Sequence, residues 1–441
     1  MRVRRETGVI TRGGRCGSVL LAPVPYRVAH GSLGFHSAYR GLNSNDCYCE
    51  RAVFDGQKPK SIESNRFLSS FDVIFVTMAW EIEVFSLIKA LQLSSIKADR
   101  RVRDVSDPLI IVGGPLTFSN PHCMYPIADA IFVGEADDAF SMITDAISLA
   151  VSREDALRRL ADIPGMWVPS LTDVCPLLTV VPRGFSPQHT QVITDDTTFG
   201  NAFLVEVGRG CINRCGYCVV SGARVRPRFV APEQVLNVIP QDVRHVGLIA
   251  PAVSYHPGLS EILEPLVDKG VLVTVSSVAA DGIDDKALHL LAKGGLNSIT
   301  TAADGASERL RGLVNRRVRD RDLLNFARHC AFRGIRRIRL YLIVGLPNET
   351  EADLAEFADL ATAISGLVSL TVSVAPLIPK KNTALASAEF LGKAAIRRKY
   401  RDLRKLLPKG VNISVASITQ AQQEARLAAL NLPTLKEVMG S

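Results

Sequence analysis

The sequence predicts an α/β protein with two successive units of parallel β-strands and crossover helices. The chain has 441 residues, 47% of them hydrophobic, which exceeds the roughly 250 to 300 residues that a single core usually serves. Two stretches alternate short apolar runs with helical patterns, as chains that form parallel sheets do. A less regular stretch rich in Pro and Thr separates them. Two cores are therefore expected.

The first series lies within residues 1–150. Four short apolar runs have the length and composition of buried strands, at residues 19–24, 73–77, 109–112 and 130–133. Two segments between them carry apolar side chains at helical spacing, at residues 81–91 and 137–151. This alternation indicates a Rossmann-like parallel sheet. Residues 151–200 are expected to form a connector with a few strands.

The second series occupies residues 201–383. Its strand candidates lie at residues 202–207, 245–250, 271–276, 297–301, 338–344 and 369–375. Its helix candidates lie at residues 232–239, 258–268, 284–293, 320–333 and 350–364. Six such units predict a partial (β/α)6 barrel of the TIM type, whose chemistry should lie at the carboxyl ends of its strands. The C-terminal tail, residues 384–441, should add a basic helix, a strand at 411–415 and a final helix.

Charge and composition limit the classes of partner. Lys and Arg outnumber Asp and Glu by 52 to 44, partly in two clusters: Arg316, Arg317, Arg319 and Arg336, Arg337, Arg339. We interpret these clusters as solvated faces, because no aromatic side chains interleave them as nucleic-acid binding would require. No apolar run approaches the roughly 18 to 20 residues of a membrane span, so a soluble protein is expected. The first apolar run reads as a strand and not as an export signal.

The cysteines are distributed in a way that disulfide bonds explain poorly. Their number is nine, and three of them, Cys211, Cys215 and Cys218, fall within eight residues, so a reducing cytoplasm is the expected location. These three directly follow the strand candidate at 202–207. Three thiolates can bind three irons of a 4Fe–4S cluster and leave the fourth iron open to a ligand. Zinc prefers four ligands and no second pair follows nearby, although zinc and unrelated buried cysteines remain alternatives. The other cysteines are not expected to be ligands: Cys16, Cys47, Cys49, Cys123, Cys175 and Cys330.

This loop resembles the hallmark of the radical SAM superfamily, a CxxxCxxC sequence after the first barrel strand with an aromatic residue before the third cysteine. Tyr217 occupies that aromatic position. The resemblance covers residues 202 to about 383. It implies that the open iron chelates S-adenosylmethionine (SAM), and that one-electron reduction releases a 5'-deoxyadenosyl radical that abstracts hydrogen from a substrate.

Two further segments resemble the same superfamily. Residues 297–311 are similar to its fourth-strand segment, which implies that Asp304 approaches the SAM ribose; Glu308 either shares this role or serves as a helix-start charge. Residues 340–351 are similar to the fifth-strand signature, which implies SAM contacts at Gly345 and Pro347. A glycine there lets the backbone come close to the adenine.

The first unit resembles the cobalamin-binding domain that precedes many radical SAM barrels. The resemblance rests on Gly113 and Gly114 after one strand and on Gly134 after the next. The Asp-His-Gly motif that supplies a lower cobalt ligand is absent, and neither His30 nor His36 stands in that context. This implies either cobalamin bound without a protein histidine on cobalt, or a domain that has lost the cofactor.

The leading hypothesis is a radical SAM enzyme that uses cobalamin to methylate an unactivated carbon. In the family scheme one SAM methylates cobalt and a second yields the radical that activates the substrate. One alternative is a cobalamin-independent radical SAM rearrangement, cyclisation or oxidation. Another is an iron–sulfur RNA-binding or regulatory protein. An electron donor of the flavodoxin or ferredoxin type is expected, whereas the sequence identifies neither the substrate nor catalytic residues beyond the cluster ligands.

Overall fold

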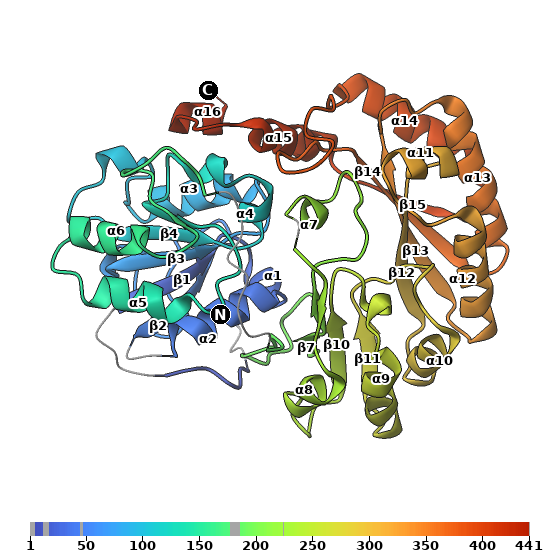
Figure 1. Ribbon diagram of the computed structural model, residues 1–441, viewed down its shortest axis with the longest axis horizontal. Coiled ribbons are helices and arrows are strands. Elements are labelled where there is room, and N and C mark those ends of the chain that lie inside the picture. Colours follow the sequence, from blue (N-terminus) through green and yellow to red (C-terminus); the bar gives the residue numbers. More distant parts are fainter. Residues whose placement is uncertain (1–4, 12–16, 45–46, 177–185, 224, 441) are drawn as a thin grey trace. The chain divides into compact units, whose positions relative to one another are not determined.

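The computed structural model describes residues 5–11, 17–44, 47–176, 186–223 and 225–440. The chain divides into two compact units (Figure 1). Unit 1 consists of Met1–Asn201 together with Arg426–Ser441, and unit 2 of Ala202–Ala425. The expected connector at 151–200 thus lies within unit 1, and the C-terminal tail is divided between the two units.

Unit 1 contains a six-stranded sheet in the order β2-β1-β3-β4-β5-β6. Its strands are β1 (Gly17–Ala22), β2 (Tyr48–Val53), β3 (Val73–Thr77), β4 (Leu109–Gly113), β5 (Ala130–Phe132) and β6 (Met166–Trp167). The first five are parallel, and β6 is antiparallel to β5. The central strands are nearly continuous apolar sequences, VIFVT in β3 and LIIVG in β4, because both faces of the sheet are covered.

The helices of unit 1 cover the sheet on both sides (Figure 1). They are α1 (Tyr26–Ala29), α2 (Leu33–Leu42), α3 (Glu83–Leu93), α4 (Leu116–Ser119), α5 (Phe140–Ser148), α6 (Arg153–Ala161) and α16 (Leu435–Met439). One core joins α3 to Val19, Ile74 and Ile110, and also contains Leu427 and Val438 from the C-terminal segment. The other core lies on the opposite face of the sheet, where the remaining strand residues pack against α2, α5 and α6. The predicted Rossmann-like sheet is confirmed.

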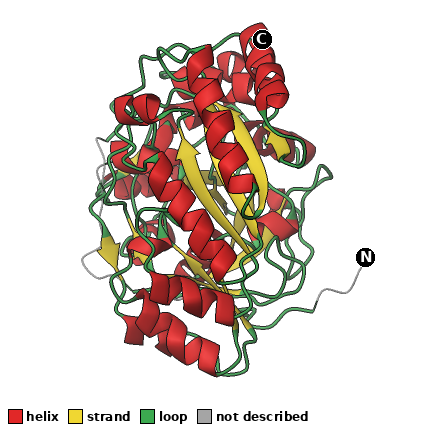
Figure 2. Cartoon of the chain, turned by 90° about the vertical axis from the view of Figure 1, so that its right-hand side faces the viewer, coloured by secondary structure: helices red, strands yellow, loops and turns green. Residues whose placement is uncertain are grey.

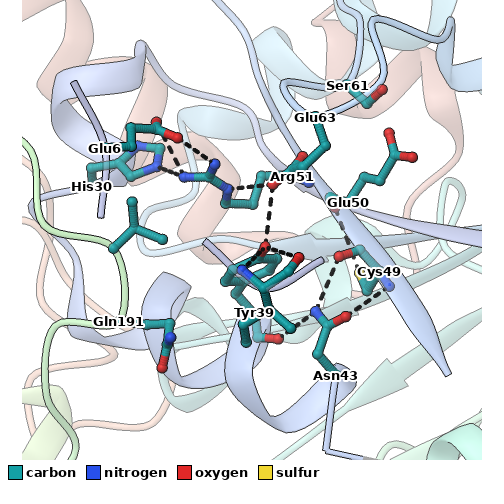
Figure 3. A network of polar contacts seen from close by, with 12 residues as sticks. Glu6, His30, Tyr39, Asn43, Cys49, Glu50, Arg51, Ser61, Glu63 and Gln191 are labelled. Atoms are coloured by element: carbon teal, nitrogen blue, oxygen red, sulfur yellow. Dashed lines mark hydrogen bonds and ion pairs between the residues drawn. The ribbon is translucent and has the colours of Figure 1, made fainter. Parts of the chain in front are cut away.

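A buried charge network fixes the edge strand β2 to the N-terminal segment (Figure 3). The Arg51 side chain is 1% exposed and pairs with Glu6 at 2.7 Å and with Glu63 at 2.6 Å. Its Nη1 also lies 2.7 Å from Nε2 of His30. Asn43 donates to the carbonyl of Cys49 at 3.0 Å and accepts from its N–H at 3.1 Å. These contacts compensate the polar groups that β2 buries.

Unit 2 is a partial barrel of parallel strands. β7 (Phe203–Glu206), β10 (His245–Ile249) and β11 (Leu272–Val275) form one sheet in the order β11-β10-β7. β12 (Ser298–Asp304), β13 (Arg337–Val344), β14 (Ser369–Pro376) and β15 (Asn412–Val415) form the next, in that order. The N–H of Val278 donates to the carbonyl of Thr300 at 3.0 Å and links the two sheets. The six expected barrel strands are present, and β15 extends the second sheet.

Helices cover one side of these sheets, and in Figure 2 they lie in front of the strands. They are α8 (Pro232–Asn237), α9 (Leu259–Asp268), α10 (Asp285–Lys293), α11 (Glu308–Leu313), α12 (Asp320–Phe332), α13 (Glu351–Ser365) and α14 (Lys393–Leu406). The short helix α7 (Val219–Gly222) lies apart from them (Figure 1). The boundary between the units falls within α15 (Ile418–Ala429). None of the helices in the described ranges combines the length and apolar character needed to cross a membrane.

Candidate functional site

The three clustered cysteines lie on a loop that follows β7. Cys211 and Cys218 are partly exposed, Cys215 is buried, and Cys218 is the N-cap of α7. The N–H of Asn213 donates to Sγ of Cys211 at 3.4 Å, and the N–H of Cys218 donates to the carbonyl of Cys215 at 3.1 Å. The loop is therefore folded on itself at the carboxyl end of the first barrel strand, where this class of fold carries its chemistry.

A glycine turn directs the chain from β7 into the loop. β8 (Gly208–Arg209) pairs antiparallel with β9 (Arg228–Phe229), so the segment after the cysteines returns alongside the segment before them. Gly210 has φ +71, and a Cβ there would lie 2.5 Å from the carbonyl oxygen of Arg226. Only glycine combines this backbone conformation with so close an approach of the returning chain.

Contacts from distant segments hold the loop in place. Asn213 donates through Nδ2 to the hydroxyl of Tyr255 at 3.0 Å, and that hydroxyl donates to Asp281 at 3.0 Å. The N–H of Gly216 donates to the carbonyl of Val314 at 2.8 Å. Asn315 donates through Nδ2 to the carbonyl of Arg214 at 2.9 Å. The loop is thus tied to the regions after β10, β11 and α11.

The thiols lie in a partly desolvated environment with a cation nearby. Burial raises the pKa of the Cys211 thiol, and the N–H of Asn213 opposes this shift. Burial also raises the pKa of the Cys215 thiol, which the positive charge of Arg316 opposes. Metal ligation requires thiolates, so a guanidinium beside them favours the ligating form.

Tyr217, Asp304 and Arg316 form one cluster of buried and partly buried side chains next to these thiols. The Tyr217 hydroxyl donates to Oδ2 of Asp304 at 2.6 Å, and Nε of Arg316 lies 3.2 Å from the same oxygen. Burial raises the pKa of the Asp304 carboxyl, and the charge of Arg316 opposes this. Asp304 has φ +65, a conformation that few non-glycine residues adopt and that is enriched at functional sites.

The burial of Arg316 contradicts the expectation that its arginine cluster is a solvated face. Its cluster was expected to form a solvated face, yet the Arg316 side chain is only 8% exposed. Its Nη2 donates to the carbonyl of Ala302 at 2.9 Å. Local sequence gave no signal for this, because the partner carboxylate of Asp304 is 12 residues away. The contacts of Asn213 and Tyr255 that support the loop were not predicted either, because they also join residues far apart in the sequence.

The described residues contain no group of three or more His, Cys, Asp or Glu side chains close enough to hold a single metal ion. Ligands of one zinc ion all lie about 2.0 to 2.3 Å from it. Thiolates that bind different irons of one cluster stand farther apart, because each reaches its own corner. The donor set of three cysteines on one loop fits a cluster.

The segment after β13 has a backbone that requires glycine. Gly345 has φ +81, and its N–H donates to Oε2 of Glu349 at 2.9 Å. Glu349 in turn pairs with Lys399 at 2.5 Å. Pro347 lies in the same turn before α13. Glu308, by contrast, begins α11 and accepts from the N–H of Asp320 at 2.8 Å, so it acts at a helix terminus.

In unit 1 the predicted glycines lie at the carboxyl ends of β4 and β5. Gly113 ends β4, Gly114 has φ +105, and Gly134 has φ +140. A Cβ on Gly114 would lie 2.6 Å from the carbonyl oxygen of Met78, which follows β3. The turns after β3 and β4 therefore pack closely together. His30 and His36 are both buried, and Nε2 of His36 lies 3.0 Å from the carbonyl oxygen of His30.

Comparison with known protein families identifies both units. Residues 205–361 match the model of the Radical SAM superfamily, and residues 34–169 match that of the N-terminal region of radical SAM proteins. The chain is a radical SAM enzyme. Both matched regions contain predicted site residues: the first includes the three cysteines, Tyr217, Asp304 and Gly345, and the second includes the three unit 1 glycines.

This radical SAM chain also resembles individual proteins. An uncharacterized protein of Methanocaldococcus jannaschii is 27% identical over 360 residues, which cover 79% of this chain and 75% of the relative. The solved structure of the radical SAM methyltransferase TsrM from Kitasatospora setae, with cobalamin and a 4Fe–4S cluster bound, matches with a TM-score of 0.61. It has 13% identity and covers 94% of this chain and 95% of TsrM.

The cobalamin-dependent SAM radical enzyme OxsB, solved with aqua-cobalamin and SAM bound, matches with a TM-score of 0.55 and 13% identity. The match covers 91% of this chain and 58% of OxsB. At these identities the likeness shows the fold alone. This radical SAM protein thus shares its fold with TsrM and OxsB, with a parallel sheet ahead of the barrel as the sequence predicts.

Proposed function

We propose that this radical SAM enzyme methylates an unactivated carbon with the help of cobalamin. In this proposal Cys211, Cys215 and Cys218 hold a 4Fe–4S cluster, which supplies the electron that splits SAM. The observation that supports it most directly is the cysteine loop, which is fixed at the carboxyl end of β7 by the Gly210 turn and by Asn213. Three thiolates leave one iron open for SAM.

The neighbouring side chains have defined tasks in this proposal. Arg316 places a positive charge beside the thiolates, and Asp304 partly neutralises it at 3.2 Å. The Tyr217 hydroxyl donates a hydrogen bond to Asp304, and this contact holds the aromatic ring in one orientation beside the cysteines. Gly345 and Pro347 keep the turn after β13 narrow, so that the backbone can approach the adenine of SAM.

The proposed cobalamin site is at the carboxyl ends of β1 and β3. The strand order β2-β1-β3-β4-β5 reverses between these two strands, and open α/β sheets bind ligands at such a reversal. Trp80 follows β3 there and is 60% exposed, which offers an aromatic surface to a planar ring. Cobalamin carries the methyl group when bound. Both TsrM and OxsB contain it in their solved structures.

The proposal includes no protein histidine on cobalt. His30 and His36 are buried, and their ring nitrogens already contact Arg51 and the backbone of unit 1. Exposing either imidazole would break these contacts. Radical SAM chemistry also needs a one-electron reductant, for which a flavodoxin or ferredoxin is the expected donor.

The cluster is tested by anaerobic reconstitution and iron analysis. We expect about four irons per chain, as in a cubane cluster, and loss of the iron when all three loop cysteines are changed to Ala. Reduced protein should then convert SAM to 5'-deoxyadenosine. A full cluster in the triple variant would refute the ligand assignment. A cluster without SAM cleavage would favour a regulatory iron–sulfur protein.

The corrin site is tested by adding hydroxocobalamin, desalting, and recording absorbance and the paramagnetic resonance of the cobalt(II) state. We expect near-stoichiometric retention and no nitrogen splitting from a protein histidine. A protein that retains no corrin but still cleaves SAM would be a cobalamin-independent enzyme for rearrangement, cyclisation or oxidation. Nitrogen splitting would contradict only the absence of a histidine ligand.

A further inference from the structure

The second arginine cluster of unit 2 lies on an uncovered face of a central strand. In β13 the side chains of Ile338, Leu340, Leu342 and Val344 are buried, whereas Arg337, Arg339 and Tyr341 are exposed. α12 and α13 lie on one side of this sheet (Figure 1). Central parallel strands are usually covered on both faces and apolar throughout. Here one face is polar, which is the pattern of a surface that contacts water or a ligand.

Hydroxyl side chains flank each of these residues. Arg337 is aligned with Ser298 of β12 and Ser369 of β14, and Arg339 with Thr300 and Thr371. Tyr341 is aligned with Ser373, whose Oγ accepts from Nη1 of Arg339 at 3.2 Å. We name the set of Arg337, Arg339, Tyr341 and their flanking hydroxyl residues the arginine face. Barrel interiors that serve as packed cores carry branched apolar side chains at such positions.

The arginines have no counter-ion in the part of the chain that the structure describes. Among the described residues no carboxylate forms an ion pair with Arg336, Arg337 or Arg339. The Arg337 side chain donates to the neutral side chain of Asn297, and the Arg339 side chain to the hydroxyl of Ser373. Arg337 and Arg339 are two residues apart on one face, so their Cα atoms are separated by about 7 Å. The Arg337 guanidinium reaches toward Asn297 and the Arg339 guanidinium toward Ser373, so this face presents two positive charges with only neutral partners.

A cavity continues the arginine face at the start of the strands. Its volume is about 620 Å³, and its walls include Asn297, Arg336, Arg337 and Ser369. At the other end of β13, Tyr341 is 46% exposed and precedes the Gly345 turn. A ligand along this face would meet arginines at one end and the aromatic ring toward the carboxyl end of the strand.

We propose that the arginine face binds the substrate through an oxyanion, a carboxylate or a phosphate. Guanidinium groups present paired N–H donors that match the two oxygens of such groups, and the hydroxyls of Thr300, Thr371 and Ser373 can add single hydrogen bonds. The Cα of Arg339 is five residues before the end of β13, about 16 Å of strand. The substrate is therefore extended, with its anionic end away from the carboxyl edge. This inference rests on the proposed function, which assigns the radical chemistry to that edge.

The test measures anion binding by calorimetry with the full-length, cluster-containing protein. The probes are inorganic phosphate and succinate, which distinguish the two sources of the oxyanion. We expect the native protein to bind at least one of them and Arg339→Gln to weaken that binding at least tenfold. Arg339→Lys should lose less, because it keeps the charge but not the paired donors. Arg328→Gln is the matched control, since Arg328 is an exposed arginine on α12.

The inference is wrong if the native protein binds neither probe, if Arg339→Gln binds as the native protein does, or if Arg328→Gln loses as much affinity. Thermal unfolding shows whether the variants are folded, and Arg339→Lys provides the comparison if Arg339→Gln is not. Formation of 5'-deoxyadenosine by the native protein is measured separately. Its absence alongside specific anion binding would refute the proposed radical chemistry and not the anion site.

Discussion

At the scale of single residues, buried charges are retained where a partner lies close enough to compensate them. Arg51 and Arg311 are each 1% exposed, and each pairs with a carboxylate, Arg311 with Asp320. Moving a charged side chain out of water costs roughly several kcal/mol, unless an opposite charge and hydrogen bonds take the place of the lost water. The Arg51 network therefore holds β2 and the N-terminal segment in one arrangement. Its stability depends on every charged side chain that takes part in it.

Glu63→Gln should destabilise unit 1 by about 3 kcal/mol, because it leaves the buried Arg51 guanidinium with part of its charge uncompensated. Glu63 currently accepts from Nε and from the N–H of Arg51 at 2.6 and 2.7 Å. Urea unfolding of the variant measures the change. Lys97→Ala is the matched control, since Lys97 also pairs with a carboxylate at 2.6 Å but is 43% exposed. Equal effects of the two changes would contradict a special role for burial.

His36 should make the stability of unit 1 depend on pH. Burial lowers the pKa of its imidazole from 6.5 to about 4, so the unfolded chain binds a proton first as the pH falls. The stabilisation is fully present above pH 6.5 and is lost progressively toward pH 4, by up to about 3 kcal/mol. In the His36→Gln variant, the free energy of unfolding should differ less between pH 7.5 and pH 5 than it does in the native protein. An unchanged difference would show that other groups carry the dependence.

At the scale of elements, apolar patterns predicted the parallel strands well and missed those held by polar contacts. β3 is predicted at its observed bounds, because VIFVT is apolar except for its last residue and β-branched at four of five positions. β2 was missed because YCERAV contains Glu50 and Arg51, whose burial depends on partners outside the strand. The cysteine loop was predicted from its spacing. Its supports at Tyr255 and Arg316 were not, because they meet the loop only in the folded chain.

The turn into the cysteine loop gives an element-scale prediction. Gly210→Ala would place a Cβ 2.5 Å from the carbonyl oxygen of Arg226 at φ +71, so the loop must shift to accommodate it. We expect reconstituted protein to hold clearly fewer than about four irons, with the circular dichroism spectrum retained. Gly312→Ala is the control, because nothing lies within 4 Å of a Cβ there. A full iron content in Gly210→Ala would show that the turn tolerates a side chain.

At the scale of the whole molecule, unit 1 is assembled from both ends of the sequence. Residues 426–441 return to it after the whole of unit 2. Leu427 and Val438 are fully buried in the core that contains α3 and Trp167. Asn120 Nδ2 donates to the carbonyls of Leu427, Ala428 and Leu430 at 3.1, 3.0 and 2.9 Å. The core of unit 1 is complete only when this segment is present, whereas unit 2 is continuous in sequence.

A chain that ends at Ala425 should therefore lose stability in unit 1 and keep it in unit 2. Removing Leu427 and Val438 leaves a cavity in the core, and a single buried Leu→Ala change already costs about 2 to 5 kcal/mol. Hydrogen exchange should show faster exchange in β3 and β4 of the shortened chain, with β12 to β14 unchanged and cluster iron retained. Leu427→Ala should give a smaller effect in the same strands. Met439→Ala is the control, because that side chain is 44% exposed. Unchanged protection of β3 and β4 in the shortened chain would show that unit 1 is stable without its C-terminal segment.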